Sequence, residues 1–107
     1  MNVLFICNQN QNRSRTAKKV FEGRFKTKSA GLYNSHPVTE KQISWADLVV
    51  VMEDRQRSEI AQRFPKQYMM KRIISLGIPD VYRYGQPELV GILEERLDEL
   101  AQIENHA

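Results

Sequence analysis

The chain contains 107 residues, of which 41% are hydrophobic and 27% charged, a composition that suits one globular domain over residues 1–107 and excludes a disordered protein. The net charge of +3 is unevenly placed, because residues 1–85 carry 15 Lys and Arg against 7 Asp and Glu, whereas residues 86–107 carry 1 against 6. The basic part is expected to attract anions such as phosphorylated substrates, and nucleic acid is not favoured because no basic run is interleaved with aromatic residues.

Strands and helices alternate along the predicted secondary structure. In chain order we expect a strand over residues 2–7, a helix over 13–25, a short strand over 26–29, a short helix capped by Thr39 and running toward Trp45, a strand over 48–52, a helix over 54–64, a strand over 72–76 and a last helix that begins at Pro87. Pro65 is expected to stop the helix before it. The apolar stripe of the last helix consists of Leu89, Val90, Ile92, Leu93, Leu97 and Leu100.

Four strands that alternate with helices predict a fold of the α/β class, a doubly wound four-stranded parallel sheet in a three-layer α/β/α arrangement. In such folds a ligand binds beyond the C-terminal ends of the strands. Cys7 ends the first strand and the loop 77–86 follows the last one, so both lie at that edge. Asp80, the one carboxylate in this loop, is therefore expected within reach of Cys7.

Cys7 is the only cysteine, and Arg13 and Ser14 follow it after five intervening residues. The loop formed by Asn8, Gln9, Asn10, Gln11 and Asn12 is expected to curl around an anion, which would meet backbone N–H groups and the positive end of a helix dipole. The loop contains no glycine, but asparagine tolerates the left-handed turns that such a loop needs. Ser14 can cap the helix or donate its hydroxyl to a Cys7 thiolate.

These residue types suit hydrolysis of a phosphate ester. A Cys7 thiolate can attack phosphorus to form a phosphocysteine, while the planar fork of Arg13 holds two phosphate oxygens. Asp80 can protonate the leaving oxygen and then activate water. Tyr82 either forms a wall of the substrate cleft or packs its loop down, and the alternative for Cys7 is an inert buried cysteine at the end of a strand.

The same residues resemble the low-molecular-weight protein tyrosine phosphatases. Val3 to Cys7 with the Cys-x5-Arg-Ser loop resembles the opening of that family, and further matches follow in the same order along the chain. These are Ser29-Ala30-Gly31 after the second strand, Asp47 to Met52-Glu53 as the central strand, and Ile78-Pro79-Asp80-Val81-Tyr82 as the acid loop. The resemblance implies a phosphatase I-like fold without a metal or other cofactor.

Residue by residue, the resemblance implies Cys7 as nucleophile, Arg13 with the loop amides as the phosphate site, and Asp80 as general acid. It further implies Ser14 as partner of the thiolate, and Asn10 as a brace of the loop with Ser29 as its hydroxyl partner. The departures from the family pattern are a shorter segment between Gly31 and Trp45, Asn12 in place of a second loop cysteine, Gln9 and Gln11 in place of a glycine and an apolar residue, and Val81 in place of a proline. The chain is most similar to a short bacterial branch of predicted tyrosine phosphatases.

The resulting hypothesis is a cysteine-dependent phosphatase acting on a phosphorylated protein, foremost on phosphotyrosine, or on a small phosphomonoester. Two alternatives stay open: a catalytically weak module that binds phospho-ligands, suggested by the Asn/Gln loop and Val81, and a phosphatase for a nucleotide or RNA phosphate, suggested by the basic body. One unpaired cysteine, no stretch long enough to span a membrane and no signal-peptide pattern favour the cytoplasm. The sequence does not indicate the oligomeric state.

Overall fold

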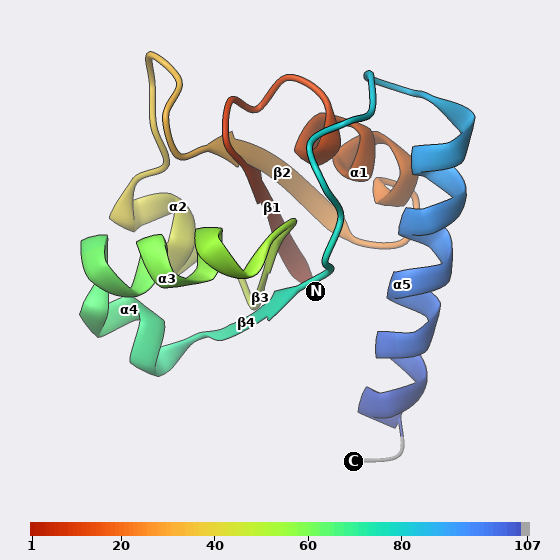
Figure 1. Ribbon diagram of the computed structural model, residues 1–107. Coiled ribbons are helices and arrows are strands. Elements are labelled where there is room, and N and C mark those ends of the chain that lie inside the picture. The colour runs from red at the N-terminus through yellow and green to blue at the C-terminus, as the bar shows by residue number, and fades with distance from the viewer. Residues whose placement is uncertain (106–107) are drawn as a thin grey trace.

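The computed structural model describes the backbone of residues 1–105 and the side chains of residues 1–99. Its elements are β1 (Asn2–Cys7), α1 (Arg13–Phe21), β2 (Lys26–Gly31), α2 (Glu40–Trp45), β3 (Leu48–Val51), α3 (Asp54–Arg63), α4 (Pro65–Met70), β4 (Arg72–Ser75) and α5 (Pro87–Asn105) (Figure 1). The four strands pair in parallel in the order β2-β1-β3-β4. The predicted doubly wound α/β/α fold is confirmed.

The helices cover both faces of the sheet and create two hydrophobic clusters. Figure 1 shows α1 and α5 on one face and α2, α3 and α4 on the other. Because side chains alternate along a strand, Phe5 of β1 packs with Phe21 of α1 and Leu93 of α5, whereas its neighbour Leu4 packs in the second cluster with Ile60 of α3. β1 and β3 are buried on both faces, as their continuous apolar sequences predict.

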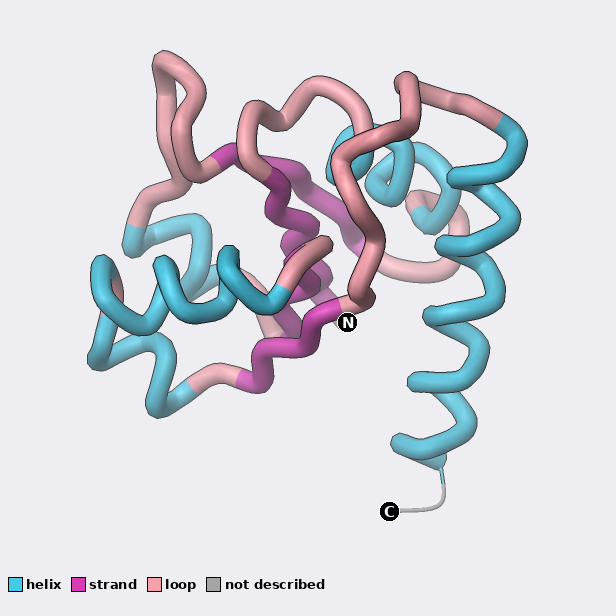
Figure 2. Tube along the Cα trace, in the orientation of Figure 1, coloured by secondary structure: helices cyan, strands magenta, loops and turns pink. Residues whose placement is uncertain are grey.

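The register brings the C-terminal ends of the strands together. Cys7 is paired with Gly31 of β2, and Ile6 with Val51 of β3, which is itself paired with Ser75 of β4. The loops that leave these ends gather at one edge of the sheet, drawn at the top of Figure 2. This edge is the one at which doubly wound folds bind ligands.

The end of one predicted helix is wrong, and one helix was not predicted at all. The helix predicted to reach residue 25 ends at Phe21, whose carbonyl oxygen accepts from the backbone N–H of Arg24 and of Phe25 at 2.9 and 3.0 Å, closing a turn that leads into β2. The predicted stop before Pro65 is correct, with α3 ending at Arg63 and not at residue 64, but Pro65 is also the first residue of α4, a helix that the sequence pattern did not reveal. Proline is favoured there, since its missing N–H has no intrahelical partner at that position.

The remaining boundaries differ by smaller amounts. Continued pairing with β1 extends β2 to Gly31, whereas β3 and β4 each end one residue before the predicted boundary, at Val51 and Ser75. Leu100, predicted in the apolar stripe of α5, lies outside the described side chains. Among the described residues, no helix has the length and the apolar character needed to cross a membrane.

Candidate active site

Cys7 lies at the C-terminal end of β1 with only 3% of its surface exposed, and the loop 8–12 leads from it directly into α1. Asn10 adopts the left-handed conformation, with φ of 54°, and is the only non-glycine residue in the described part of the chain with positive φ. Of the asparagines that could take left-handed turns, Asn8, Asn10 and Asn12, only Asn10 does so, and the expectation is wrong for the other two. Asn12 precedes α1 at the N-cap position with φ of −119°.

Ser14 contacts the sulfur instead of capping α1. Its hydroxyl oxygen lies 2.9 Å from Cys7 Sγ and also 2.9 Å from Asn10 Oδ1. Of the two roles that the sequence left open, the structure therefore favours contact with the sulfur. Asn10 in turn is linked to the sulfur through this hydroxyl, so the left-handed turn of the loop and the position of Sγ depend on one hydrogen-bonded chain.

Arg13 is a buried cation with a half-satisfied guanidinium group. Only 1% of the residue is exposed, and its Nη1 donates to the Ile78 carbonyl oxygen at 2.7 Å and to the Glu53 carboxylate. Its Nε and Nη2 are buried and have no hydrogen-bond partner. Buried polar groups are nearly always paired, so two adjacent orphan donors indicate a missing acceptor. Nε and Nη2 form the fork with which arginine binds two oxygens of one anion.

A cavity of about 40 Å³ lies in front of this fork. It is lined by Cys7, Gln9, Gln11, Asn12, Arg13 and Asp80. The volume exceeds what one water molecule occupies and suits a small tetrahedral oxyanion. The structure thus brings together the cysteine, the arginine and the carboxylate that the sequence singled out, around one space.

Asp80 reaches the cavity from the loop that follows β4. Its Oδ1 lies 3.7 Å from Arg13 Nε, and 54% of its side chain is exposed. The loop is fastened at both ends: Ile78 N–H donates to the Met52 carbonyl oxygen at 2.7 Å, and Tyr84 N–H donates to Asn12 Oδ1 at 3.0 Å. These bonds hold Asp80 over the cavity although its own side chain faces solvent.

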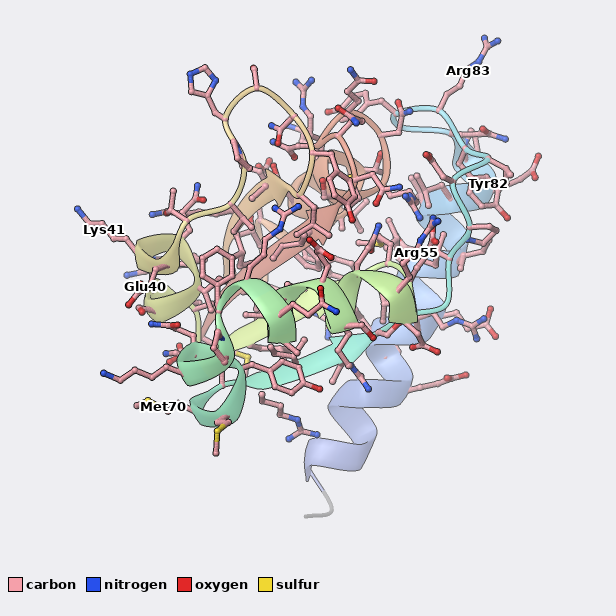
Figure 3. The ribbon with its side chains drawn as sticks, turned by 60° about the vertical axis from the view of Figure 1, so that its left-hand side comes forward. Glu40, Lys41, Arg55, Met70, Tyr82 and Arg83 are labelled. Atoms are coloured by element: carbon pink, nitrogen blue, oxygen red, sulfur yellow. The ribbon has the colours of Figure 1, made fainter. Side chains whose placement is uncertain are left out.

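Of the seven residues predicted to bind phosphate, Gln9, Gln11, Asn12 and Arg13 line the cavity, whereas Asn8, Asn10 and Ser14 do not. Tyr82 and Ser29 lie apart from the cavity as well. Tyr82 is partly buried and packs against the hydrophobic cluster under α5, on the loop from which Arg83 projects into solvent (Figure 3). Ser29 is not brought to Asn10, because among the hydrogen bonds of the described residues Asn10 bonds to Ser14 and none joins it to Ser29. Ser29 lies instead beside the outer face of α1, close to Arg15 and Lys18.

Glu53 is a site residue whose contact with Arg13 the sequence did not reveal. It follows β3, contacts the buried guanidinium of Arg13, and accepts from Arg55 Nη2 at 3.0 Å. Burial raises the pKa of Glu53, but the hydrogen bond and charge of Arg13, together with Arg55, outweigh burial and hold the pKa below its ordinary value of 4.5. The ionised carboxylate therefore fixes one edge of the guanidinium and leaves the other edge open.

Gln56 is a second residue that sequence reasoning missed. Only 1% exposed, it accepts from the backbone N–H groups of Met52 and Glu53 at 2.8 and 2.9 Å, and donates to Asn8 Oδ1 at 3.0 Å. It thereby ties the end of β3 to the loop after Cys7. The signal was its place three residues after the N-cap Glu53, the capping-box position at which a glutamine reaches back to the backbone.

Comparison with solved structures identifies the fold. A mutant of the arginine phosphatase YwlE with a phosphorylated active-site serine matches with a TM-score of 0.77 and 23% identity, over 95% of this chain and 94% of that one. The tyrosine phosphatase AmsI of Erwinia amylovora matches with a TM-score of 0.76 and 18% identity, over 95% of this chain and 91% of that one. A low-molecular-weight protein tyrosine phosphatase from T. tengcongensis matches with a TM-score of 0.69 and 22% identity, over 92% of this chain and 99% of that one.

The chain therefore has the fold of the low-molecular-weight protein tyrosine phosphatases, as the sequence resemblance implies. No family model matches the sequence. No curated protein matches it either.

Replacing Glu53 by Gln tests its role as partner of the buried Arg13. We expect the free energy of unfolding at pH 7 to fall by about 1–3 kcal/mol, because a charge-assisted hydrogen bond to a buried cation is weakened. Since the pKa of Glu53 is lowered from 4.5, its contribution is complete above that pH and is lost as the pH falls through the lowered value. Urea unfolding between pH 7 and pH 3 should show the difference from wild type shrinking.

Glu59→Gln is the matched control, because Glu59 is 27% exposed and pairs with the partly exposed Arg63 on the same helix. It should cost about 0.5 kcal/mol or less. A loss for Glu53→Gln that equals this control, or that stays constant with pH, would contradict the assigned contact.

Replacing Gly31 by Ala tests how closely the loop after Cys7 packs on β2. A Cβ atom at Gly31 would lie 2.5 Å from Asn34 Oδ1 and 3.0 Å from the backbone nitrogen of Asn10. Because Asn34 Oδ1 is buried, we expect Gly31→Ala to destabilise the fold by about 1–3 kcal/mol and to weaken phosphate binding. Gly91→Ala is the control: it lies in α5, where an added Cβ atom would meet nothing within 4 Å, and should stabilise by about 0.5–1 kcal/mol. Unfolding curves with and without inorganic phosphate measure both effects, and a neutral Gly31→Ala would refute the close approach.

Proposed function

We propose that this protein is a cysteine-dependent phosphatase that hydrolyses phosphomonoesters, with protein phosphotyrosine as its substrate, through a phosphocysteine intermediate. The observation that carries the proposal is the orphan fork of Arg13, whose Nε and Nη2 are buried without partners in the same cavity that Cys7 and Asp80 line. A phosphate group would supply the missing acceptors and would stand in front of the sulfur. The neighbouring structures named as tyrosine and arginine phosphatases support this choice of chemistry.

In the first step, the Cys7 thiolate attacks phosphorus, the S–P bond forms and the ester P–O bond breaks. Asp80 donates its proton to the leaving oxygen, which departs as an alcohol or phenol. Arg13 holds two of the equatorial oxygens through Nε and Nη2, and the N–H groups of the loop 8–12 face the developing charge. This step requires the acid form of Asp80, because only a protonated carboxyl group can donate to the leaving oxygen.

In the second step, water attacks the phosphocysteine, the S–P bond breaks, and inorganic phosphate leaves with the thiolate restored. The Asp80 carboxylate, now without its proton, accepts one from the attacking water and returns to its starting state. Both steps therefore use the same three side chains and consume only water. The phosphorylated active-site serine of the YwlE mutant is consistent with such a covalent route.

Ser14 would stabilise the thiolate in both steps. A hydroxyl has one proton, and when the sulfur is ionised that proton is best donated to Sγ. In the structure Ser14 Oγ donates to Asn10 Oδ1 at 2.9 Å. If the Asn10 amide turns over, its N–H group can donate to Ser14 Oγ instead, which leaves the hydroxyl proton for the sulfur. The Ser14 hydroxyl would then accept a hydrogen bond from Asn10 and donate one to the sulfur of Cys7.

We further propose that the protein works in a reducing compartment such as the cytoplasm. Its nucleophile must stay a thiol or thiolate, and Cys7 is the only cysteine in the sequence. An oxidised Cys7 therefore cannot be protected by a disulfide within the chain.

Turnover of an aryl phosphate by wild type, Cys7→Ser and Asp80→Asn tests the proposed function. We expect Cys7→Ser to abolish turnover and Asp80→Asn to lower kcat by roughly 10²- to 10⁴-fold, the usual contribution of a general acid. Asp98→Asn is the matched control, because it removes a carboxylate that is 60% exposed, against 54% for Asp80, from the surface of α5. It should keep wild-type turnover.

Rapid quenching should trap a phosphoenzyme in wild type that is absent in Cys7→Ala, which has no nucleophilic side-chain atom. Comparing the turnover of phosphotyrosine, phosphoarginine and nucleotide phosphates by wild type identifies which class of phosphate compound the protein prefers. Turnover that survives Cys7→Ser would refute the mechanism, and saturable phosphate binding without turnover would identify a binding module instead.

A further inference from the structure

A second hollow, of about 130 Å³, lies on the outer side of α1. It is lined by Arg15, Lys18, Lys19, Glu22, Ser29 and Tyr84. These residues come from α1, from β2 and from the loop that carries Asp80, so three separate segments of the fold build one space. None of them takes part in the chemistry proposed for Cys7.

The hollow has uncompensated positive charge. Lys19 and Glu22 form an ion pair at 3.1 Å and cancel one another. Arg15 and Lys18 have no carboxylate partner among the ion pairs of the described residues, although both face the same space. They are three residues apart on one helix face, where like charges repel. An anion between them would remove this repulsion.

Further donors and a fixed orientation complete the site. The Arg15 guanidinium lies over the Tyr84 ring, 5.4 Å from its centroid, so the ring holds the cation at the edge of the hollow. Ser29 lines the same space, and no hydrogen bond of the described residues occupies its hydroxyl. A carboxylate in the hollow would therefore meet a guanidinium, an ammonium and a hydroxyl group.

The second hollow adjoins the cavity of Cys7. Asn12 lines the cavity and Tyr84 lines the hollow, and the Tyr84 N–H donates to Asn12 Oδ1 at 3.0 Å. Arg15 follows Asn12 by three residues, which is about one helical turn or roughly 5 Å along α1. Neighbouring residues of an extended peptide are separated by about 3.8 Å between Cα atoms, so one short peptide can span both spaces.

We propose that this hollow binds an acidic side chain next to the phosphorylated residue in a peptide substrate, and so selects acidic sequences. The proposal rests on the phosphatase function proposed above. Arg15 and Lys18 are the specificity-determining residues, because they supply the unpaired charge. Lys19 contributes less, since Glu22 already neutralises it.

The test compares two phosphotyrosine peptides that are identical except for Glu or Gln on both sides of the phosphotyrosine. For wild type we expect kcat/KM to favour the Glu peptide by on the order of tenfold, the contribution of two exposed ion pairs. In Arg15→Gln/Lys18→Gln the ratio should fall to about one. High salt should reduce the wild-type ratio, because exposed ion pairs are screened.

Lys41→Gln/Lys66→Gln is the matched control, because it removes two exposed positive charges elsewhere; Lys41 lies on α2, on the far side of the molecule from Tyr82 and Arg83 (Figure 3). This variant should keep the wild-type ratio. A wild-type ratio near one, a ratio that survives in Arg15→Gln/Lys18→Gln, or an equal loss in the control would each overturn the proposal.

An aryl phosphate without a peptide separates this proposal from the proposed function. If wild type turns over neither the aryl phosphate nor the peptides, the phosphatase function fails, and the same ratio is then measured as peptide affinity by titration calorimetry. If a small molecule with two phosphates depends on Arg15 and Lys18 while the two peptides are equivalent, the hollow takes a second phosphate and the peptide proposal is refuted.

Discussion

The burial of one guanidinium group, that of Arg13, is the constraint on which the rest of the structure depends. A cation that is 1% exposed is costly unless it is paired, and Arg13 is hydrogen-bonded along one edge only, with Glu53 and the Ile78 carbonyl oxygen, while Asp80 lies 3.7 Å from Nε on the other edge. Those partners come from the ends of β3 and β4, whereas Arg13 follows β1. The contact therefore pulls three strand ends toward one point, and the unpaired edge faces the sulfur of Cys7. An anion in the cavity would supply the hydrogen-bond acceptors that the Arg13 guanidinium lost when folding removed it from water.

The supporting residues act by limiting how that charge can move. Gln56 links the end of β3 to Asn8, and Asn12 holds the backbone of the loop that carries Asp80. Gly31 allows Asn34 and the backbone of Asn10 to approach β2 closely. The space in front of Arg13 is thus bounded by hydrogen bonds between loops and not by a hydrophobic wall, which explains how a segment rich in Asn and Gln can form a small, defined cavity without glycine. Polar side chains here perform the positioning that backbone freedom performs in a glycine-rich loop.

Features that depend on the local sequence pattern could be predicted from the sequence. Contacts between segments far apart in the chain could not. Apolar runs located β1, β3 and β4, whereas the polar β2 was located only in part, and the spacing from Cys7 to Arg13 located the cavity. α4 was missed because Pro65, which correctly indicated the end of α3, is equally well suited to begin a helix. Glu53 was recognised only as a strand end, since nothing in its neighbourhood reveals a buried arginine forty positions earlier. Ser29 was placed beside Asn10 by resemblance alone, and the bond from Ser14 shows that the loop closes on itself with a hydroxyl from α1.

Charge around the cavity also explains why the wider surface of the protein is basic. Arg13 faces the Glu53 and Asp80 carboxylates, and Arg55 also pairs with Glu53, so with a Cys7 thiolate this group carries three negative charges against two positive charges. A dianionic ester enters such a space favourably only if a proton resides on Asp80 and if N–H dipoles and more distant cations outweigh the remainder. The excess of Lys and Arg over residues 1–85, 15 against 7 acidic residues, supplies that distant field, and Arg15 and Lys18 bring part of it to within about a helical turn of Asn12. The side chains at the cavity therefore determine the chemistry and which group holds the proton. The surrounding Lys and Arg residues make the approach of an anion favourable.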